Sequence, residues 1–133
     1  VRKKGGKVIH GNMINLPFED NSFDCIISIA SYHHLDNNND RTRAINEMYR
    51  VLKNDGLIYI QVWAMEQPFK SRRKFLKRDE LVPWKNKDGS ILYRYYHIYP
   101  KGELELEIKK IRPEFKIMNT IYEEGNWSLV LLK

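Results

Sequence analysis

Cysteine is almost absent from this sequence of 133 residues, since Cys25 is the only one. A single cysteine excludes a disulfide framework and a cysteine-based zinc site. Cys25 stands within an apolar run without an activating neighbour, so we expect a buried and inert thiol. No apolar run approaches the roughly 20 residues that span a bilayer, and no apolar segment follows the basic N-terminus as in a signal peptide. These absences predict a cytoplasmic or nuclear protein with no membrane partner.

The glycine-rich signatures of phosphate binding are also missing. There is no Gly-x-Gly-x-x-Gly and no Walker lysine loop, and Gly5-Gly6 precedes a candidate strand instead of following one. Metal ligands are scarce too. The adjacent residues His33-His34 would rarely face one ion, and no other histidine or cysteine has zinc spacing. We therefore predict no metal site.

Positive charge is in moderate excess, with 23 Lys+Arg against 17 Asp+Glu and a net charge of +6. This balance favours a polyanionic partner. Part of the excess falls in one short segment that holds no acidic residue. The segment is either a solvated basic face or a set of phosphate contacts. Its basic residues are Lys70, Arg72, Arg73, Lys74, Lys77 and Arg78.

Hydrophobic periodicity predicts one α/β domain over residues 1–133. The apolar, β-branched run 23–30 indicates a strand covered on both faces, as in a parallel sheet. Residues 41–52 have helical spacing, and Asn54-Asp55-Gly56 supplies a left-handed residue to stop the helix. With a strand at 57–63, this order predicts a parallel βαβ unit with a right-handed crossover.

The other predicted elements are less regular. Charges, prolines and weak periodicity over 67–92 predict an irregular insertion, with one short helix within it. The two segments at the C-terminus are joined by Glu123-Glu124-Gly125-Asn126, which suits a hairpin that extends the same sheet. The predicted elements are a strand at 8–10, a short helix at 70–78, a helix at 102–111, and strands at 115–122 and 127–132.

Polar and aromatic residues follow the predicted strands. An α/β sheet binds ligands beyond the carboxyl ends of its strands, where 12–13, 30–34 and 63–67 should converge. The run 93–99 adds four tyrosines, an arginine and a histidine. Together they suggest a site that stacks and hydrogen-bonds a planar polar substrate. Each histidine of the pair at 33–34 is either a structural, hydrogen-bonded residue or a base, proton shuttle or substrate anchor.

Several motifs carry a family resemblance. The broader ones are Asn15-Leu16-Pro17-Phe18, Phe23-Asp24, His33-His34-Leu35 and Arg50-Val51-Leu52; the narrower ones are Val62-Trp63-Ala64-Met65-Glu66-Gln67, Leu81-Val82-Pro83-Trp84 and Arg94-Tyr95-Tyr96-His97-Ile98-Tyr99. With these motifs the chain resembles the class I S-adenosylmethionine-dependent methyltransferases. More narrowly, it resembles the eukaryotic tRNA wobble-uridine carboxymethyl methyltransferases. The resemblance implies a Rossmann-like sheet that ends in an antiparallel hairpin.

Relative to that family, the chain starts near the third strand of the sheet. We therefore expect a fragment of a longer enzyme that lacks the first two strands and the glycine-rich loop. Residues 1–10 should be mobile, abnormally paired, or paired with another molecule. This chain alone should bind the cofactor poorly and be inactive. The resemblance implies that S-adenosylmethionine contacts Asn12, Met13, Ala30 and Ser31. Asn12 stands where many relatives have an aspartate.

The resemblance also implies the reaction, in which the 5-carboxymethyl group of the wobble uridine becomes its methyl ester. The expected catalytic residues are His34 and Arg94. The expected substrate-binding residues are His33, Trp63, Tyr95, His97, Lys70, Arg72, Arg73 and Lys74. The implied partners are the tRNA anticodon loop and a small zinc-containing activator subunit, which would pair with an edge at Val8-Ile9. Two alternatives are a non-catalytic tRNA- or protein-binding domain and a small-molecule methyltransferase of the same superfamily.

Overall fold

A βαβ unit forms the centre of the protein, in a computed structural model that describes residues 7–133. Strand β1 (Phe23–Ile29) is followed by helix α1 (Asn38–Val51) and strand β2 (Leu52–Trp63). The two strands are parallel, with Ile26 opposite Ile58 and Ser28 opposite Ile60. The predicted parallel pair and its crossover helix are confirmed.

The two ends of α1 are set by different means. The side-chain oxygen of Asn37 accepts a hydrogen bond from the backbone N–H of Asp40 at 2.8 Å, which is an N-cap. At the other end, Leu52 is already extended and begins β2. The left-handed residue that follows is Asp55 (φ 61°), and Gly56 has no positive φ. Gly56 is small for another reason, since a Cβ there would lie 2.7 Å from the Leu52 side chain.

The C-terminal hairpin completes the main sheet. Strands β5 (Lys116–Glu123) and β6 (Asn126–Leu132) are antiparallel, and β6 pairs with β2, so the strand order is β1-β2-β6-β5. Glu124 and Gly125 join them with positive φ angles of 46° and 80°. Two such residues form the turn whose twist matches a hairpin. The predicted hairpin and its place in the sheet are confirmed.

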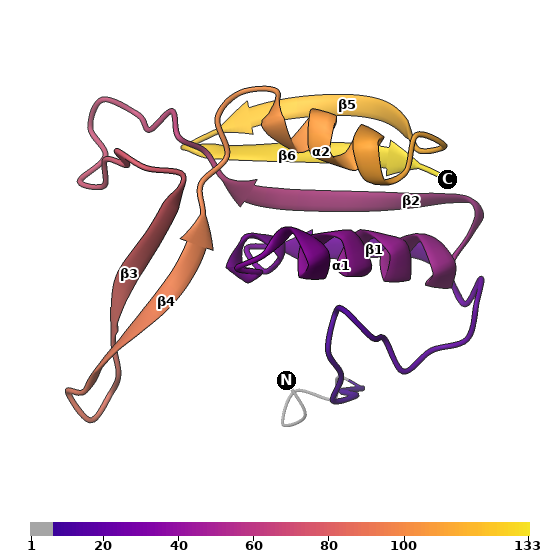
Figure 1. Ribbon diagram of the computed structural model, residues 1–133, viewed down its shortest axis with the longest axis horizontal. Coiled ribbons are helices and arrows are strands. Elements are labelled where there is room, and N and C mark those ends of the chain that lie inside the picture. The colour runs from indigo at the N-terminus through magenta and orange to yellow at the C-terminus, as the bar shows by residue number, and fades with distance from the viewer. Residues whose placement is uncertain (1–6) are drawn as a thin grey trace.

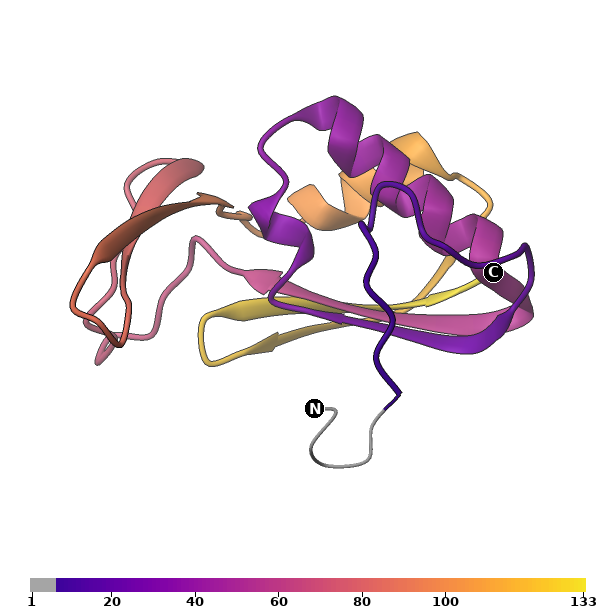
Figure 2. The ribbon, with the colours of Figure 1, turned by 90° about the horizontal axis from the view of Figure 1, so that it is seen from below.

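Both main helices lie on the same face of this sheet (Figure 2). Helix α2 (Glu103–Ile111) lies beside α1, and their apolar residues pack on β2 and β6 to form the core. On the other face of β1, Cys25, Ile27 and Ile29 are exposed. The predictions of a buried Cys25 and of a β1 covered on both faces are therefore wrong for residues 7–133. An apolar run shows that a strand is suited to burial, and the packed elements decide which faces are buried.

A second, two-stranded sheet stands away from this body (Figure 1). It consists of β3 (Asp79–Lys85) and β4 (Ile91–His97), which form a hairpin within the predicted irregular insertion. The irregular assignment is thus wrong from residue 79 onward, and 70–78 is not helical. Within the described residues the strand at 8–10 does not form either, and its residues are exposed. The expectation for residues 1–6 lies outside the described part of the chain.

Gly125 lies in the turn between β5 and β6, and Gly102, before α2, has a similar positive φ angle. Substituting each glycine by alanine therefore tests how tightly the β5–β6 turn is packed. A Cβ at Gly102 (φ 83°) would stand in open space, whereas a Cβ at Gly125 (φ 80°) would lie 2.6 Å from Gln67 Oε1. Gln67 cannot easily retreat, because its amide donates to the carbonyls of Ala64 and Gly125. We expect Gly102→Ala to lower the free energy of unfolding by about 1–2 kcal/mol. Gly125→Ala should cost about 1–3 kcal/mol more. Urea unfolding measures both, and equal losses would contradict the predicted clash.

Candidate functional site

Aromatic rings pack together where the ends of β1 and β2 meet β4. We call this group the aromatic wall, and its rings are those of His33, Trp63, Phe75 and Tyr96. A short 3-10 helix, η2 (Tyr32–His34), follows β1 and places two histidines beside the end of β2. The Trp63 ring stacks on Tyr96 with centroids 4.1 Å apart and planes 11° apart. Phe75 also stacks on Trp63, at 5.7 Å. The structure thus brings together residues from four segments of the chain, which are η2, the end of β2, the segment before β3 and β4.

His33 lies inside this wall and is fully buried. The backbone N–H of Trp63 donates to its Nδ1 at 3.0 Å, so a neutral ring carries its proton on Nε2. Burial, together with the nearby His34, lowers the pKa of His33 to about 3. His33 is therefore a neutral, buried residue that accepts the backbone N–H of Trp63, and its expected role in substrate binding stays a prediction.

His34 occupies the accessible side of the same short helix. Its Nδ1 lies 2.9 Å from the carbonyl oxygen of Tyr95, so Nδ1–H donates to that oxygen. This bond leaves Nε2 as an acceptor in the neutral ring. His34, Arg94 and Tyr95 line one cavity of about 350 Å³. The structure therefore brings the two expected catalytic residues to the same place.

Arg94 is held by an aromatic ring from the neighbouring strand. Its guanidinium lies over the Trp84 indole, 4.4 Å from the ring centroid. None of the ion pairs among residues 7–133 includes Arg94. A guanidinium stacked by its face keeps its N–H edge for a carboxylate or a phosphate.

The basic segment lies against the same wall. Arg73 lies over the Trp63 ring at 4.5 Å. Arg72, Arg73 and Lys74 line a cavity of about 370 Å³ beside residues 80–83 of β3. Lys70 is exposed nearby in sequence. Three of the four basic residues expected to bind substrate thus share one cavity.

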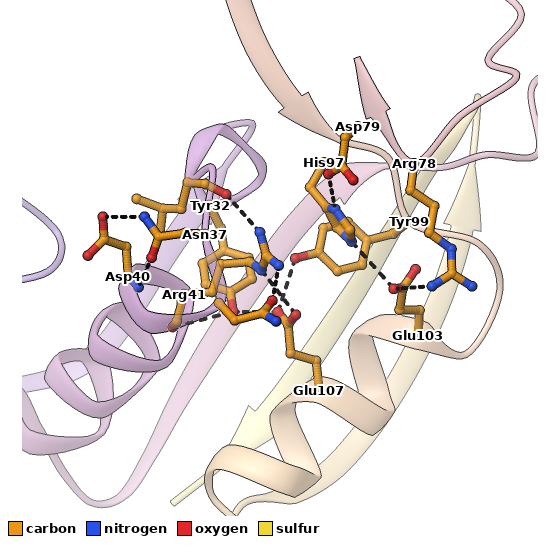
Figure 3. A network of polar contacts seen from close by, with 12 residues as sticks. Tyr32, Asn37, Asp40, Arg41, Arg78, Asp79, His97, Tyr99, Glu103 and Glu107 are labelled. Atoms are coloured by element: carbon orange, nitrogen blue, oxygen red, sulfur yellow. Dashed lines mark hydrogen bonds and ion pairs between the residues drawn. The ribbon is translucent and has the colours of Figure 1, made fainter. Parts of the chain in front are cut away.

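His97 takes part in a different set of contacts, at the base of the β3–β4 hairpin (Figure 3). Its Nδ1 lies 2.9 Å from Asp79 Oδ1, and its Nε2 lies 3.4 Å from Glu103 Oε1. The Tyr95 hydroxyl also donates to Asp79. Burial, together with the Asp79 carboxylate, raises the pKa of Tyr95 to about 12. His97 therefore connects the hairpin to α2 and is separate from the cavity of His34 and Arg94.

Sequence reasoning missed a partly buried cluster of polar residues beside these contacts. Glu107 of α2 accepts hydrogen bonds from the hydroxyls of Tyr32 at 2.6 Å and Tyr99 at 3.0 Å, and Arg41 Nε lies 3.2 Å from its other oxygen (Figure 3). Burial and the Glu107 carboxylate raise the pKa of both tyrosines. The sequence contained one signal of this cluster. Arg41 precedes Ile45 by four residues and so falls on the apolar face of α1, where an arginine needs an acidic partner.

The residues expected at the cofactor lie on the N-terminal loop and just beyond β1. Asn12 Oδ1 accepts from the backbone N–H of Ile14 at 3.2 Å, and Met13 packs against the core. Ala30 has a positive φ of 49°, and the Ser31 hydroxyl lies 3.0 Å from that of Ser28. A left-handed alanine at the carboxyl end of a strand is unusual and is found most often near functional sites.

Comparison with known proteins agrees with the arrangement of strands. The model of a family described as "Methyltransferase domain" matches residues 1–60. A solved S-adenosylmethionine-dependent methyltransferase from Methanosarcina mazei superposes with a TM-score of 0.69 at 19% identity, over 92% of this chain and 65% of that chain. The fold is therefore that of the class I S-adenosylmethionine-dependent methyltransferases.

Sequence relatives point to a particular group within this class. The protein named "Probable tRNA methyltransferase 9B" from Mus musculus is 49% identical over 84 residues, which are 63% of this chain and 18% of that protein. The "tRNA (carboxymethyluridine(34)-5-O)-methyltransferase" of Schizosaccharomyces pombe is 32% identical over 96% of this chain and 64% of its own length. The chain thus spans less than two thirds of these relatives. The predicted resemblance to tRNA methyltransferases is confirmed.

The depressed pKa of His33 gives stability a distinct pH dependence. The unfolded chain binds a proton at His33 near its ordinary pKa of 6.5, and the folded chain does so only near 3. Between these values the unfolded state binds more protons, so stability falls as the pH falls. We expect His33 to contribute a loss of about 1.4 kcal/mol per pH unit below 6.5.

The measurement is urea unfolding between pH 7 and pH 4.5. The variant His33→Gln should lose this component, although it should be less stable at pH 7. The control His34→Gln should keep the acid-induced loss. A wild-type curve with the same slope as the His33→Gln curve would show that His33 is not held neutral.

Proposed function

We propose that this chain is part of a methyltransferase that uses S-adenosylmethionine to form the methyl ester of the 5-carboxymethyl group on the wobble uridine of tRNA. The observation that carries this proposal is the match to the fission yeast enzyme along nearly the whole chain. The cavity of His34, Arg94 and Tyr95 supports it, because it presents an arginine and aromatic surfaces to a planar, anionic group.

This reaction needs orientation more than acid–base chemistry. The substrate carboxylate is ionised at neutral pH and is itself the nucleophile, so no proton has to be removed. S-adenosylmethionine supplies the methyl group from a sulfonium centre. The protein has to hold one carboxylate oxygen in line with that methyl group, which is catalysis by proximity and orientation.

Arg94 and His34 have complementary properties for this purpose. The free edge of the Arg94 guanidinium can bind both oxygens of a carboxylate, and the Trp84 ring limits its movement. His34 donates Nδ1–H to Tyr95, so its Nε2 accepts a hydrogen bond and suits the N3–H of a uracil ring. We therefore assign the binding of the substrate carboxylate to Arg94 and the binding of the uracil ring to His34, with Tyr95 beside both.

Among the residues expected to contact the cofactor, Asn12 can accept a hydrogen bond from an adenosyl group. Asn12 Oδ1 accepts one hydrogen bond, from Ile14, and its second lone pair can accept from an adenine amine. Met13, Ala30 and Ser31 would be the neighbouring contacts. Lys70, Arg72, Arg73 and Lys74 would contact tRNA phosphates. The zinc-containing activator subunit stays a prediction, with Val8 and Ile9 as the exposed segment it would pair with.

Nucleoside analysis tests the function itself. In cells that lack the gene, tRNA should accumulate 5-carboxymethyluridine at the wobble position and lose the methyl ester, as measured by mass spectrometry of digested tRNA. Unchanged methyl-ester levels would refute the proposal. A methylated small molecule that disappears instead would support the small-molecule alternative.

Single-turnover kinetics test the role of Arg94. In the full-length protein Arg94→Ala should slow methyl transfer to tRNA by about 100-fold or more. The reason is that the substrate carboxylate is no longer oriented once the guanidinium that donates to it is removed. Arg94→Lys should restore little, since an ammonium cannot reproduce the planar fork. Affinity for S-adenosylmethionine should change little. The matched control is Arg43→Ala, which removes an exposed arginine from α1. A normal rate for Arg94→Ala would reduce Arg94 to a structural partner of Trp84.

A further inference from the structure

Several large apolar side chains of the β3–β4 hairpin are exposed to solvent. It stands away from the body of the protein (Figure 1). Trp84 is 45% exposed and Tyr93 is 67% exposed, although both belong to paired strands. The exposed large apolar residues of the hairpin are Leu81, Trp84, Ile91, Leu92 and Tyr93. By the strand register, Trp84 and Leu92 share one face of the hairpin, and Leu81, Ile91 and Tyr93 share the other. Exposed apolar side chains that gather on one face mark an interaction surface.

The charge of the chain is concentrated in the same region. Residues 70–97 hold nine Lys and Arg against three Asp and Glu, which is an excess of +6. The whole chain also has a net charge of +6, so all other residues together balance to zero. Six of these basic residues lie in 70–78, directly before the hairpin, and the hairpin itself holds Lys85, Lys87 and Arg94 against three acidic residues. Exposed aromatic rings beside lysines and an arginine, next to a basic segment, match the chemistry of single-stranded nucleic acid and not that of an apolar protein surface.

One face of the hairpin continues the aromatic wall of the cavity outward. Trp84 is opposite Leu92, and Arg94 is two residues further along the same face, followed by Tyr96. Tyr96 stacks on Trp63, and Arg94 lies over Trp84. One face of the hairpin therefore carries Tyr96, Arg94 and Trp84 in a continuous row. This row runs from the cavity of His34 to the outer half of the hairpin.

We propose that this face, made of Trp84, Leu92 and Arg94, is a docking arm for an unpaired stretch of RNA next to the nucleotide in the cavity. A base stacks on the side of the Trp84 indole that Arg94 leaves open, and Lys85 and Lys87 contact its flanking phosphates. The inference rests on the proposed function for the nature of the RNA. It adds a second contact, outside the reacting nucleotide and outside the basic segment at 70–74.

Stacking and charge leave different signatures in RNA binding, and this difference gives the test. The affinity of the full-length protein for a fluorescently labelled tRNA anticodon stem-loop is measured at several salt concentrations. Trp84→Leu should weaken binding by about 10-fold and leave the salt dependence unchanged, because a stacked base releases no counterions. Trp84→Phe should bind within about 3-fold of the wild type. Replacing Lys85 and Lys87 together by Gln should reduce the slope of log K against log salt by about 1.4.

The control is Tyr122→Leu, which removes a ring of similar exposure from β5, away from the hairpin. It should bind RNA like the wild type, and thermal unfolding should show that Trp84→Leu is folded. Wild-type RNA affinity for Trp84→Leu overturns the proposal. If that variant only slows methyl transfer, Trp84 merely positions Arg94; if it instead loses a co-purifying protein, the arm binds protein. The nucleoside analysis reports separately on the proposed function, so its failure cannot be mistaken for failure of the arm.

Discussion

One partly buried carboxylate, that of Glu107, connects the elements that make the site. It accepts hydrogen bonds from Tyr32 in η2 and Tyr99 after β4, and it pairs with Arg41 of α1. These groups come from four segments that are not continuous in sequence. The position of Tyr32 fixes the two histidines that follow it, and the position of Tyr99 fixes the end of β4. Arg41 is buried, and a buried charge destabilises the fold when its partner is removed, so the arrangement has few alternatives.

This anchor explains why two adjacent histidines differ so much. In the short helix η2 one ring must turn inward and the next outward. His33 turns inward, accepts the backbone N–H of Trp63, and is held neutral by burial. His34 stays accessible and is oriented by the carbonyl of Tyr95. His33 is a structural part of the aromatic wall, and His34 lines the cavity in which a ligand would bind.

The hairpin has a complementary dependence on the body. Its base is fastened by Asp79, His97 and Glu103, together with an ion pair at 3.0 Å between Arg78 and Glu103. Beyond this base its strands pair only with each other in the described residues. Arg94 therefore reaches the cavity from an element that is rigid at one end and exposed at the other. The same geometry that aims Arg94 at His34 leaves Trp84 at the surface.

Much of the fold follows from local patterns in the sequence. The apolar, β-branched run of β1, the helical spacing from Ile45 to Val51, and the short linker at Glu124-Gly125 each determine an element or a turn through short-range physics. The parallel pair follows as well, because a strand, a helix and a strand with short joints have one common arrangement. The resemblance of motifs to tRNA methyltransferases also came from the sequence alone.

Tertiary structure decided what depends on partners from distant segments. Burial of Cys25 and of one face of β1 depends on which side the helices pack, and a strand pattern cannot state this. The hairpin at 79–97 was hidden because its two-stranded sheet exposes apolar residues and so lacks the usual alternation. The separate roles of His33, His34 and His97 follow from Trp63, Tyr95 and Asp79, each contributed by another segment of the chain. Residue types reveal which chemistry is available, and only the packing of distant segments determines which groups meet.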